Sequence, residues 1–470
     1  MLGVMKRENV RRAFSLDLVA LAGVCALTAC GVEVDVGSSG AGRPTGPGAV
    51  SVEPAGSGAG SPGSRDGGIA ETTTSSSGGD GGSAAIGSTG AGSSTPVDAG
   101  SVSLPLGGPR LFAGADDACY LSASGHVACW GSNETGQLGL GDFTDRRTPT
   151  WIPALSDVVD LAVADFAICA LKIDGSVWCA GMNFYGELSV DTPYCQNLGY
   201  ECSATFVHAS SVPLARALFP GDHGLLSLDA ADDDFSTWGA GPGVDAPGNP
   251  VVSAAAGYFH TCLLLQPGAG DDPAKNVVCF GDEPAVQPGQ GRVSAGGVPF
   301  TQLAAGDEFT CGVGADQKAY CWGDNLSGEL GVGVSEDSDY PESCTNAACA
   351  KKPTLVAGLP PVAAIAAHFY EACALTTAGD VYCWGAPSHT SPASSDACYG
   401  VGPLCMPTPR QVLGVSEVTS IGVGYGHSCA LGAQGDIHCW GLDTHGQLGR
   451  GQGPSFEDAP VSVTLPAEPE

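Results

Sequence analysis

Basic residues are scarce in this chain, whereas acidic residues are common. The sequence has 18 Lys and Arg against 50 Asp and Glu, which gives a formal net charge of −32. Within residues 101–470, 41 acidic and 12 basic residues leave a net charge of −29. A surface of this sign repels phosphate groups, so we expect no nucleic-acid partner. The charge suits a soluble secreted domain equally well.

The apolar run near the start of the chain is too short for a permanent transmembrane helix. Leu18 to Leu27 is a ten-residue, mostly apolar run that follows a stretch with four Lys and Arg residues. A membrane-spanning helix needs about 20 apolar residues, whereas this arrangement is typical of an export signal. The run ends in Leu27-Thr28-Ala29-Cys30, which resembles the lipobox of bacterial lipoproteins. The resemblance implies cleavage before Cys30 and acylation of this cysteine, so residues 1–30 are predicted to be a signal segment with a lipobox.

Two alternatives stay open for this segment. An ordinary signal peptide with a chance cysteine at position 30 would have the same charged and apolar regions. In addition, Arg11-Arg12-Ala13-Phe14 resembles a twin-arginine export motif, although we expect the general secretory route. Either route predicts an exported protein of the cell envelope. The lipobox predicts a membrane attachment through lipid only, in the outer membrane or periplasm of a bacterium.

Residues 31–100 lack the apolar and aromatic side chains of a folded domain. They consist mainly of Gly, Ser, Ala, Thr and Pro. Such a segment cannot bury enough apolar surface to offset the entropy lost on ordering, so we predict a flexible linker. A linker of this kind has a root-mean-square length of about 45 Å and would hold the next domain away from the membrane.

Residues 101–470 repeat one unit seven times. In Cys429 to Gly441, two cysteines ten positions apart enclose a short turn, and the second precedes Trp-Gly. The same spacing occurs in Cys119–Gly131, Cys169–Gly181, Cys311–Gly323 and Cys373–Gly385, with a longer copy in Cys262–Gly281. A seventh copy, around His223 to Gly239, has Leu225 and Thr237 at the positions assigned to the cysteines. Seven copies at intervals of 42 to 62 residues indicate a repeat architecture.

Each repeat predicts short strands and no long helix. A Pro-containing extended piece precedes an apolar run, the cysteine hairpin follows, and a glycine-rich loop such as Gly131-Ser-Asn-Glu-Thr-Gly-Gln-Leu-Gly139 comes last. Three to four strands in each of seven repeats predict an all-β, seven-bladed β-propeller. Since Pro460 to Leu465 matches the opening extended piece of the other repeats, we expect this last strand to complete the first blade.

The repeat resembles a known family. The unit Cys-Ala-Leu…Asp-Gly…Val…Cys-Trp-Gly, followed by Gly-x-Asn-x-x-Gly-Gln-Leu-Gly, is similar to the regulator of chromosome condensation (RCC1) repeat. The resemblance covers residues from about 109 to 465 and implies a seven-bladed propeller. It implies much less about function, because one fold hosts many activities. Light sensing, known in a plant branch of the family, would need tryptophans clustered with arginines, and this chain has few basic residues.

The cysteines outside the signal segment fall into nine local pairs, and such pairing favours disulfides in an oxidising compartment. We predict six hairpin bonds, Cys119–Cys129, Cys169–Cys179, Cys262–Cys279, Cys311–Cys321, Cys373–Cys383 and Cys429–Cys439, and three loop bonds, Cys195–Cys202, Cys344–Cys349 and Cys398–Cys405. A three-residue hairpin turn, with Gly125, Gly175, Gly379 or Gly435 in the left-handed position, would bring paired cysteines to a Cα distance of about 5.5 Å. Zinc is the alternative, but the loop pairs lack the second pair of a Cys₄ site.

The sequence contains no nucleophile–base pairing, phosphate loop or carboxylate pair at a telling spacing, so we predict no catalytic residues, no metal and no cofactor. Four histidines, His223, His260, His368 and His427, are interpreted as a matching set two residues before the first hairpin cysteine. Near the axis such a ring could bind a metal or an anion. A repeat residue held by backbone hydrogen bonds is the alternative, and we favour it.

These observations predict a monomeric, lipid-anchored cell-envelope protein that presents its propeller as a protein-binding module. The alternative is an envelope enzyme or carbohydrate-binding protein with a site at the propeller mouth. The loops with their own cysteine pairs are expected on one face, because equivalent loops of a ring emerge together. Their aromatic residues, Tyr194, Tyr200, Tyr340 and Tyr399, are the predicted binding residues, since tyrosine is enriched at binding hot spots.

Overall fold

The computed structural model describes residues 107–195, 198–221, 224–231, 234–239, 248–258, 260–281, 292–293, 297–325, 327–333, 349–386 and 406–469. The chain divides into two units, Met1–Gly90 and Ala91–Glu470, and all described residues belong to the second unit. The predicted signal segment, Cys30 and the predicted linker therefore lie outside the described residues. Within the described part of the chain, no helix has the length and apolar character needed to cross a bilayer.

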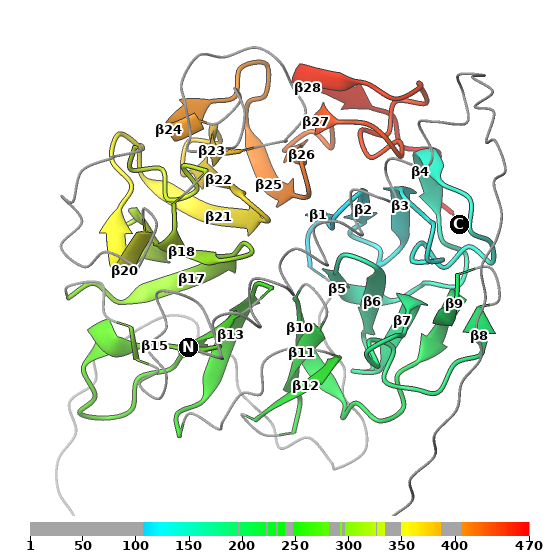
Figure 1. The fold of residues 1–470 in the computed structure, drawn as a ribbon, viewed down its shortest axis with the longest axis horizontal. Helices are drawn as coiled ribbons and strands as arrows, with labels where there is room; N and C mark the ends of the chain where they lie inside the picture. The colour runs from blue at the N-terminus through cyan, green and yellow to red at the C-terminus, as the bar shows by residue number, and fades with distance from the viewer. Residues whose placement is uncertain are drawn as a thin grey trace, which may run out of the picture. The chain divides into compact units, whose positions relative to one another are not determined.

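Seven antiparallel sheets around one axis form the second unit (Figure 1). The first blade contains β1 (Arg110–Ala113), β2 (Asp117–Leu121), β3 (Val127–Gly131) and β4 (Arg146–Trp151). The second contains β5 (Val158–Val163), β6 (Ala167–Lys172), β7 (Val177–Met182), β8 (Tyr194–Cys195) and β9 (Tyr200–His208). The third contains β10 (Ala215–Pro220), β11 (Gly224–Asp229) and β12 (Phe235–Gly239). The seven-bladed, all-β propeller predicted from the sequence is confirmed.

The remaining four blades have four strands each. They contain β13 (Val251–Ala256), β14 (His260–Leu265), β15 (Val277–Gly281) and β16 (Arg292–Val293); β17 (Phe300–Ala305), β18 (Phe309–Gly314), β19 (Ala319–Asp324) and β20 (Cys349–Leu355); β21 (Val362–His368), β22 (Glu371–Thr376), β23 (Val381–Gly385) and β24 (Met406–Gln411); and β25 (Val418–Val423), β26 (His427–Gly432), β27 (Ile437–Leu442) and β28 (Phe456–Val463). A short 3-10 turn, Pro273–Lys275, precedes β15.

Proline explains which strand lies at the outer edge of each blade. Pro149, Pro353, Pro409 and Pro460 lie in β4, β20, β24 and β28, and each of these strands is the last of its sheet. A proline lacks the N–H that a central strand must donate, so it is tolerated where a strand has only one neighbour. The Pro-containing piece therefore ends a blade instead of opening the next one.

This strand order corrects the predicted closure of the ring. β28 pairs with β27 of its own blade, with Cys439 opposite Val461, and the first blade contains only β1 to β4. The expectation that the last strand completes the first blade is wrong, because the sequence repeat and the structural blade are offset by one strand. Closure comes from side-chain packing instead: β1 packs against β25 and β26.

The C-terminal residues after β28 add a second contact across this junction. The indole Nε1 of Trp151 donates a hydrogen bond to the carbonyl oxygen of Pro466 at 3.2 Å. Nδ1 of His126 lies 3.3 Å from a carboxylate oxygen of Glu468. The tail therefore lies along the first blade, although it adds no strand to that sheet.

The hairpin turns of the first, second, fifth, sixth and seventh blades have the predicted three-residue length. In the second blade the N–H of Lys172 donates to the carbonyl of Ser176 at 2.9 Å, and the three residues between them form the turn. The third residue, Gly175, has a φ of 81°, in the left-handed region that glycine adopts without strain. Gln317 takes the same conformation in the fifth blade, with a φ of 61°. The fifth turn therefore keeps its shape despite a side chain that disfavours it.

The paired cysteines face each other more closely than predicted. In all six hairpins the Cα atoms of the two cysteines are 4.0 to 4.1 Å apart, whereas about 5.5 Å was expected. The expected value belongs to the hydrogen-bonded type of cross-strand pair, and the shorter distance is typical of the non-hydrogen-bonded type. The prediction of facing cysteines is confirmed, but the expected Cα distance was too long.

The hydrophobic core lies between neighbouring blades. Trp130 of the first blade packs with Leu431 and Leu448 of the seventh, and Trp384 of the sixth packs with Leu330 of the fifth. Trp130 and Trp384 are wholly buried. Each tryptophan of a Trp-Gly pair in these blades is thus a wedge that fixes one blade against the next, a role consistent with large apolar side chains dominating burial.

Candidate functional site: the loop face and the axial cavity

One end of the propeller carries two sets of loops, which we call the loop face. The first set is the turn between the two inner strands of each blade, and the second is the loop that follows the third strand. Backbone hydrogen bonds join the two sets: Ser132 N–H donates to Asp116 O, and Met182 N–H to Phe166 O, both at 2.8 Å. All loop insertions that follow a Trp-Gly pair therefore start at this face.

The glycine-rich loops of the repeat are structural. In the first blade, Oδ1 of Asn133 accepts the N–H of Leu138 at 3.0 Å, and Oε1 of Gln137 accepts the N–H of Thr135 at 3.0 Å. The same two bonds recur in the second, fifth and seventh blades, through Asn183 and Glu187, Asn325 and Glu329, and Asp443 and Gln447. The most regular motif of the sequence thus stabilises its own loop.

The loop position that is glutamine in the first and seventh blades is glutamate in the second and fifth. Glu329 is buried, its Oε2 accepts the N–H of Ser327 at 2.6 Å, and its Oε1 has no hydrogen-bond partner. Burial, followed by the nearby charges of Asp324 and Glu308, raises the pKa of Glu329 to about 8. Burial also raises the pKa of Glu187. These acids stand where the first and seventh blades have glutamine, so they belong to the loop structure.

The predicted ring of four histidines is wrong in two of its members. The residue that opposes the glycine of Trp-Gly is Gly224 in the third blade and Glu371 in the sixth. His260 and His427 do occupy this position. His223 lies outside the described residues, and His368 ends the inner strand β21. The error in the third blade arose from aligning Leu225 with a cysteine, whereas the register places Leu226 and Thr237 there.

The side chains at this position are buried between blades. Burial lowers the pKa of His260 and of His427 to about 4, and it raises the pKa of Glu371 to about 8. Nε2 of His260 lies 2.7 Å from the hydroxyl of Thr310 in the next blade. These pKa directions favour the uncharged form of each group. Burial between blades agrees with a structural role for His260 and His427, but neither ring nitrogen of His427 has a hydrogen-bond partner among the described residues, so backbone hydrogen bonds do not hold that ring as expected.

The described residues include one close set of potential metal ligands, Glu371 with Cys373 and Cys383. Both sulfur atoms of this set belong to one disulfide, so they cannot bind a metal as thiolates. This cluster is a structural contact beneath the Glu371 carboxyl.

An axial cavity of about 380 Å³ opens among the inner strands. Its wall contains small apolar residues from successive blades, Ala113, Ala164, Ala255, Ala305 and Ala366 among them. His368 and Phe369 lie on its lining, and Nε2 of His368 is 3.1 Å from Oδ1 of Asp165. This pair joins the sixth blade to the second, which are not neighbours in the ring, so it spans the axis.

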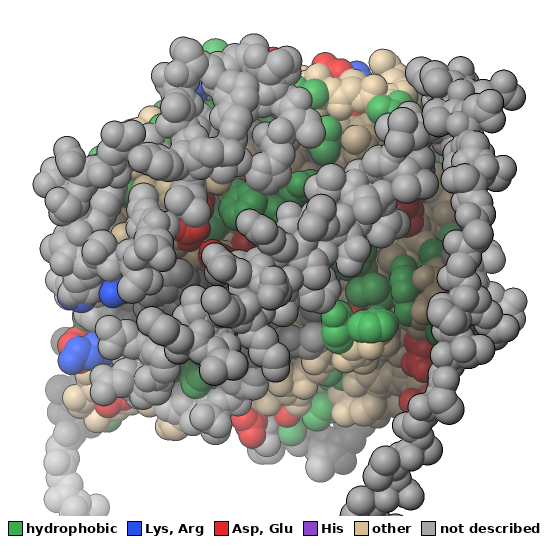
Figure 2. All heavy atoms as spheres, viewed as in Figure 1, with side chains coloured by type: hydrophobic (Ala, Val, Ile, Leu, Met, Phe, Trp, Pro, Cys, Tyr) green, Lys and Arg blue, Asp and Glu red, His purple; other side chains and the backbone are tan. Residues whose placement is uncertain are grey.

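Aromatic and acidic residues lie near the end of the cavity that His368 and Phe369 line. The Phe369 ring lies 4.6 Å from the Tyr370 ring and 4.5 Å from the Tyr425 ring, both in edge contacts. Burial raises the pKa of the Tyr425 hydroxyl, and the carboxylates of Asp116 and Asp307 raise it further. Figure 2 shows hydrophobic and acidic side chains together near β21 and β25, and a second hydrophobic group near β6 and β7.

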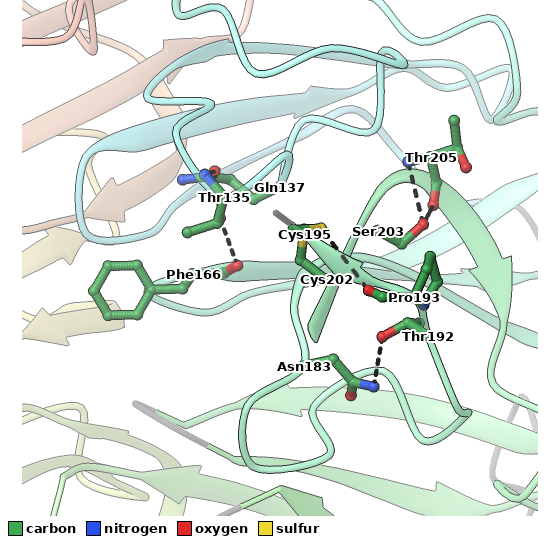
Figure 3. Close-up of a disulfide and its surroundings, with 10 residues drawn as sticks. All are labelled: Thr135, Gln137, Phe166, Asn183, Thr192, Pro193, Cys195, Cys202, Ser203 and Thr205. Carbon is green, nitrogen blue, oxygen red and sulfur yellow. Dashed lines mark hydrogen bonds between the residues drawn. A yellow bond between two sulfur atoms is a disulfide. The ribbon is translucent and has the colours of Figure 1, made fainter. Parts of the chain in front are cut away.

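One of the predicted loop disulfides lies within the described residues. Cys195 of β8 is bonded to Cys202 of β9, and the bond fastens the insertion of the second blade (Figure 3). In the same view, Nδ2 of Asn183 bonds the hydroxyl of Thr192 at 3.0 Å. Cys349 is also disulfide-bonded, whereas Cys344, Cys398 and Cys405 lie outside the described residues.

The predicted binding tyrosines differ in exposure. Tyr194 is 61% exposed, with its hydroxyl donating to the carbonyl of Gly199 at 2.5 Å, and Tyr200 is half-buried. Tyr340 and Tyr399 lie outside the described residues. The structure thus presents one of the four as an exposed side chain.

Three exposed aromatic residues on the same face escaped the sequence interpretation: Phe143, Phe184 and Tyr185, which are 42%, 61% and 40% exposed. Phe184 and Tyr185 contact each other edge to face at 4.7 Å. A signal was available, because they fill the two variable positions of the glycine-rich loop, where the first blade has Glu134 and Thr135. The loops of blades 1 and 2 meet where Gly141 N–H donates to Ala204 O at 2.7 Å.

Comparison with known proteins identifies the repeat. The family described as "Regulator of chromosome condensation (RCC1) repeat" matches residues 124–171, 300–329 and 418–447. The ultraviolet-B receptor UVR8 of Arabidopsis thaliana is 24% identical over 364 residues, which cover 76% of this chain and 70% of the receptor. The E3 ubiquitin-protein ligase HERC2 of Homo sapiens is 27% identical over 353 residues, 70% of this chain but only 7% of the ligase.

Solved structures show the same fold. Prp20p of Saccharomyces cerevisiae has a TM-score of 0.59 at 21% identity, with 74% of this chain and 88% of that chain covered. Yeast RCC1 (Prp20) in complex with Kap60 gives a TM-score of 0.58 at 19% identity, with 81% and 91% covered. At this identity the likeness concerns the fold alone. With seven blades, Trp-Gly wedges and glycine-rich loops in place, the chain carries RCC1 repeats and forms a propeller of the RCC1 type.

Proposed function

We propose that this protein is an exported lipoprotein, anchored through Cys30, whose RCC1-type propeller binds a protein partner on its loop face. The observation that carries the proposal is the group of exposed aromatic side chains on the adjoining loops of blades 1 and 2: Phe143, Phe184, Tyr185 and Tyr194. Large apolar side chains gathered at one surface mark interaction sites more often than scattered ones do. Aromatic residues also supply much of the binding energy at protein interfaces.

The Cys195–Cys202 bond suits this role. A loop fastened by a disulfide has less conformational entropy to lose when a partner immobilises it, so more of the contact energy remains as affinity. The disulfides of the hairpins support an oxidising location, which is where an exported lipoprotein would reside. Proteolytic protection of a long loop is the competing explanation for the bond.

Relatives support a protein partner in general terms. The solved structure of Prp20p is described together with its binding to Gsp1p and histones, and the same protein is seen bound to Kap60. Those partners belong to that protein. For this chain we take only the general inference that an RCC1-type propeller can serve as a protein-binding surface.

The anchor is tested by Cys30→Ala in the full-length chain. Detergent partitioning should move the protein from the membrane fraction to the soluble fraction, or leave it with an uncleaved signal. Membrane attachment equal to that of the unchanged protein would contradict the lipoprotein proposal.

The loop face is tested by cross-linking the full-length protein to envelope proteins and comparing two variants. Phe184→Ser with Tyr194→Ala should weaken recovery of a partner at least tenfold. The matched control is Leu413→Ala, because Leu413 is 75% exposed in the turn between β24 and β25, away from the glycine-rich loops. Equal losses in both variants, or a loss in the control alone, would place binding elsewhere.

The axial cavity with the His368–Asp165 pair favours the second candidate, an envelope enzyme or a carbohydrate-binding protein with its site at the mouth. An imidazole beside a carboxylate is a common arrangement for proton transfer. A screen of envelope glycans by calorimetry would support this candidate if binding were lost in His368→Ala and retained in the Phe184→Ser and Tyr194→Ala variant.

A further inference from the structure

The end of the axial cavity on the loop face combines three properties that are independent of the loop aromatics. It opens into a space with apolar walls, and Phe369 and the acidic residue Asp307 line it. A second carboxylate, that of Asp165, contacts the lining residue His368. We propose that this axial mouth binds an alkylammonium cation, with the ammonium group at Asp165 and Asp307 and the alkyl body inside the alanine-lined cavity.

The cavity has the size and lining of a small-molecule site. Its 380 Å³ lies within the usual range of ligand pockets, about 300 to 1,000 Å³. The wall residues Ala164, Ala255, Ala305 and Ala366 come from inner strands or the ends of inner strands of four different blades. Seven inner strands converge on the axis, and their small side chains leave this space open. An apolar chain inside it would replace water against apolar surface, which is favourable.

Charge selects the sign of the ligand. Asp307 lines the cavity at the mouth, and Asp165 reaches it through its contact with His368. Among the described lining residues the basic side chains are His368 and Arg110. Arg110 belongs to the opposite end of the inner strands, where its guanidinium pairs with Asp160 at 3.0 Å. The mouth therefore attracts cations, and its low-dielectric walls strengthen that attraction.

The aromatic rim favours an organic cation in particular. Phe369 has a φ of 50°, an uncommon conformation for an aromatic residue, and its carbonyl accepts the N–H of Asp307 at 2.9 Å. This bond joins the backbone of Phe369 to that of Asp307, the Phe369 ring lies beside Tyr425, and both Phe369 and Asp307 line the cavity. The electron-rich face of an aromatic ring attracts an ammonium group, and this attraction is available to alkylammonium ions.

A bare metal ion fits the mouth less well. Calcium and magnesium require several oxygen ligands within about 2.6 Å. In the described residues, the side chains that come close enough to share a metal are those of Glu371 and the Cys373–Cys383 disulfide, none of which lines the cavity. The mouth instead offers separated carboxylates and a ring, which suit a larger cation with an apolar body.

The probe for the test is hexylammonium, with 1-hexanol as a neutral molecule of the same length. Titration calorimetry on the mature full-length protein should show that hexylammonium binds with a Kd below about 10 mM, which is a weak affinity. Hexanol should bind at least tenfold more weakly. Asp307→Asn and Asp165→Asn should each weaken hexylammonium binding five- to tenfold. Asp458→Asn, an exposed carboxylate on β28, should change nothing.

Several results would overturn the proposal. These are the absence of hexylammonium binding, equal affinity for hexanol, or an unchanged affinity for hexylammonium in the Asp307→Asn variant. The Asp307→Asn variant remains informative if Asp165→Asn fails to fold. A short peptide with one lysine and blocked termini distinguishes the source of the cation. Competition with hexylammonium supports a lysine presented by a partner protein, and binding of free amines alone supports a small molecule. Neither outcome depends on Phe184 and Tyr194, so the protein-binding proposal can fail separately.

Discussion

The first, third and fifth blades share the same antiparallel hairpin, but they differ in residues of the hairpin, its turn or the loop that follows it. In the first blade, Cys119 and Cys129 are bonded across the hairpin, and Trp130 is wholly buried. In the third blade, Leu226 and Thr237 face each other instead, and Trp238 is only half-buried. The third hairpin keeps its register without the bond, so strand pairing determines the shape and the disulfide adds stability to it.

The fifth blade departs at two other points. Its turn has Gln317 where the first blade has Gly125, and its loop has Glu329 where the first has Gln137. Both residues adopt the conformation of their counterparts. The comparison teaches that the repeat tolerates a strained or desolvated residue at one blade, because the other contacts of the blade over-determine its structure.

The largest effect on the free energy of unfolding is expected when the glutamine of the first-blade loop is replaced with the glutamate found in the fifth blade. Gln137→Glu places a carboxyl group beside the buried carboxyl of Asp117, whose pKa burial already raises well above its usual range. Two acids in one desolvated site should lower the free energy of unfolding by about 3 kcal/mol at pH 7. Urea denaturation measures the change. Gln452→Glu at an exposed position is the control, and equal stability of the two variants would contradict the argument.

Removing the bond of the first hairpin should make it resemble the third. The double variant Cys119→Ala and Cys129→Ala should lose about 2 to 3 kcal/mol of unfolding free energy, since the bond closes a short loop. Hydrogen exchange should quicken in β2 and β3 before other strands. The reverse variant, Leu226→Cys with Thr237→Cys, should be more stable oxidised than reduced, and an inability to form that bond would argue against the equivalence of the two hairpins.

Replacing the acid of the fifth blade with the amide of the first should stabilise the protein in a pH-dependent way. The folded-state pKa of Glu329, about 8, lies above its ordinary value, so ionisation in the unfolded chain destabilises the fold as pH rises from about 4.5 to 8. Glu329→Gln should therefore gain on the order of 2 kcal/mol at pH 7.5 and nothing at pH 4. Thermal unfolding across this range is the measurement. A gain that is equal at both pH values would refute the electrostatic origin.

The smallest effect concerns the strained turn. Gln317→Gly should raise the free energy of unfolding by up to about 1 kcal/mol, because glycine adopts a positive φ without steric conflict. The gain is limited, since glycine also increases the entropy of the unfolded chain. Gly125→Ala, in the matching turn of the first blade, should show the opposite sign. Differential scanning calorimetry on the pair checks both, and a loss of stability in Gln317→Gly would show that its side chain forms a compensating contact.

The architecture could be predicted from the sequence, because each of the signals that specify it is local. Cysteines ten positions apart, a glycine in the turn and Trp-Gly after the second cysteine specify a hairpin through strand alternation and turn geometry. Seven such units imply a ring, since a single blade cannot bury its own faces. The all-β class, the seven blades and the RCC1 relationship could therefore be predicted from residues a few positions apart.

The contacts between residues far apart in the chain could not be predicted in this way. The offset between repeat and blade depends on which neighbour the proline-containing strand pairs with, and sequence order is silent on that choice. The same holds for the third hairpin, where an alignment one residue off at Leu225 misplaced His223 as well. His368 and Asp165 lie 203 positions apart in the chain, and only the closure of seven blades around one axis brings them into contact over a cavity. Local sequence patterns specify each blade, whereas the site at the axis arises from packing all of them together.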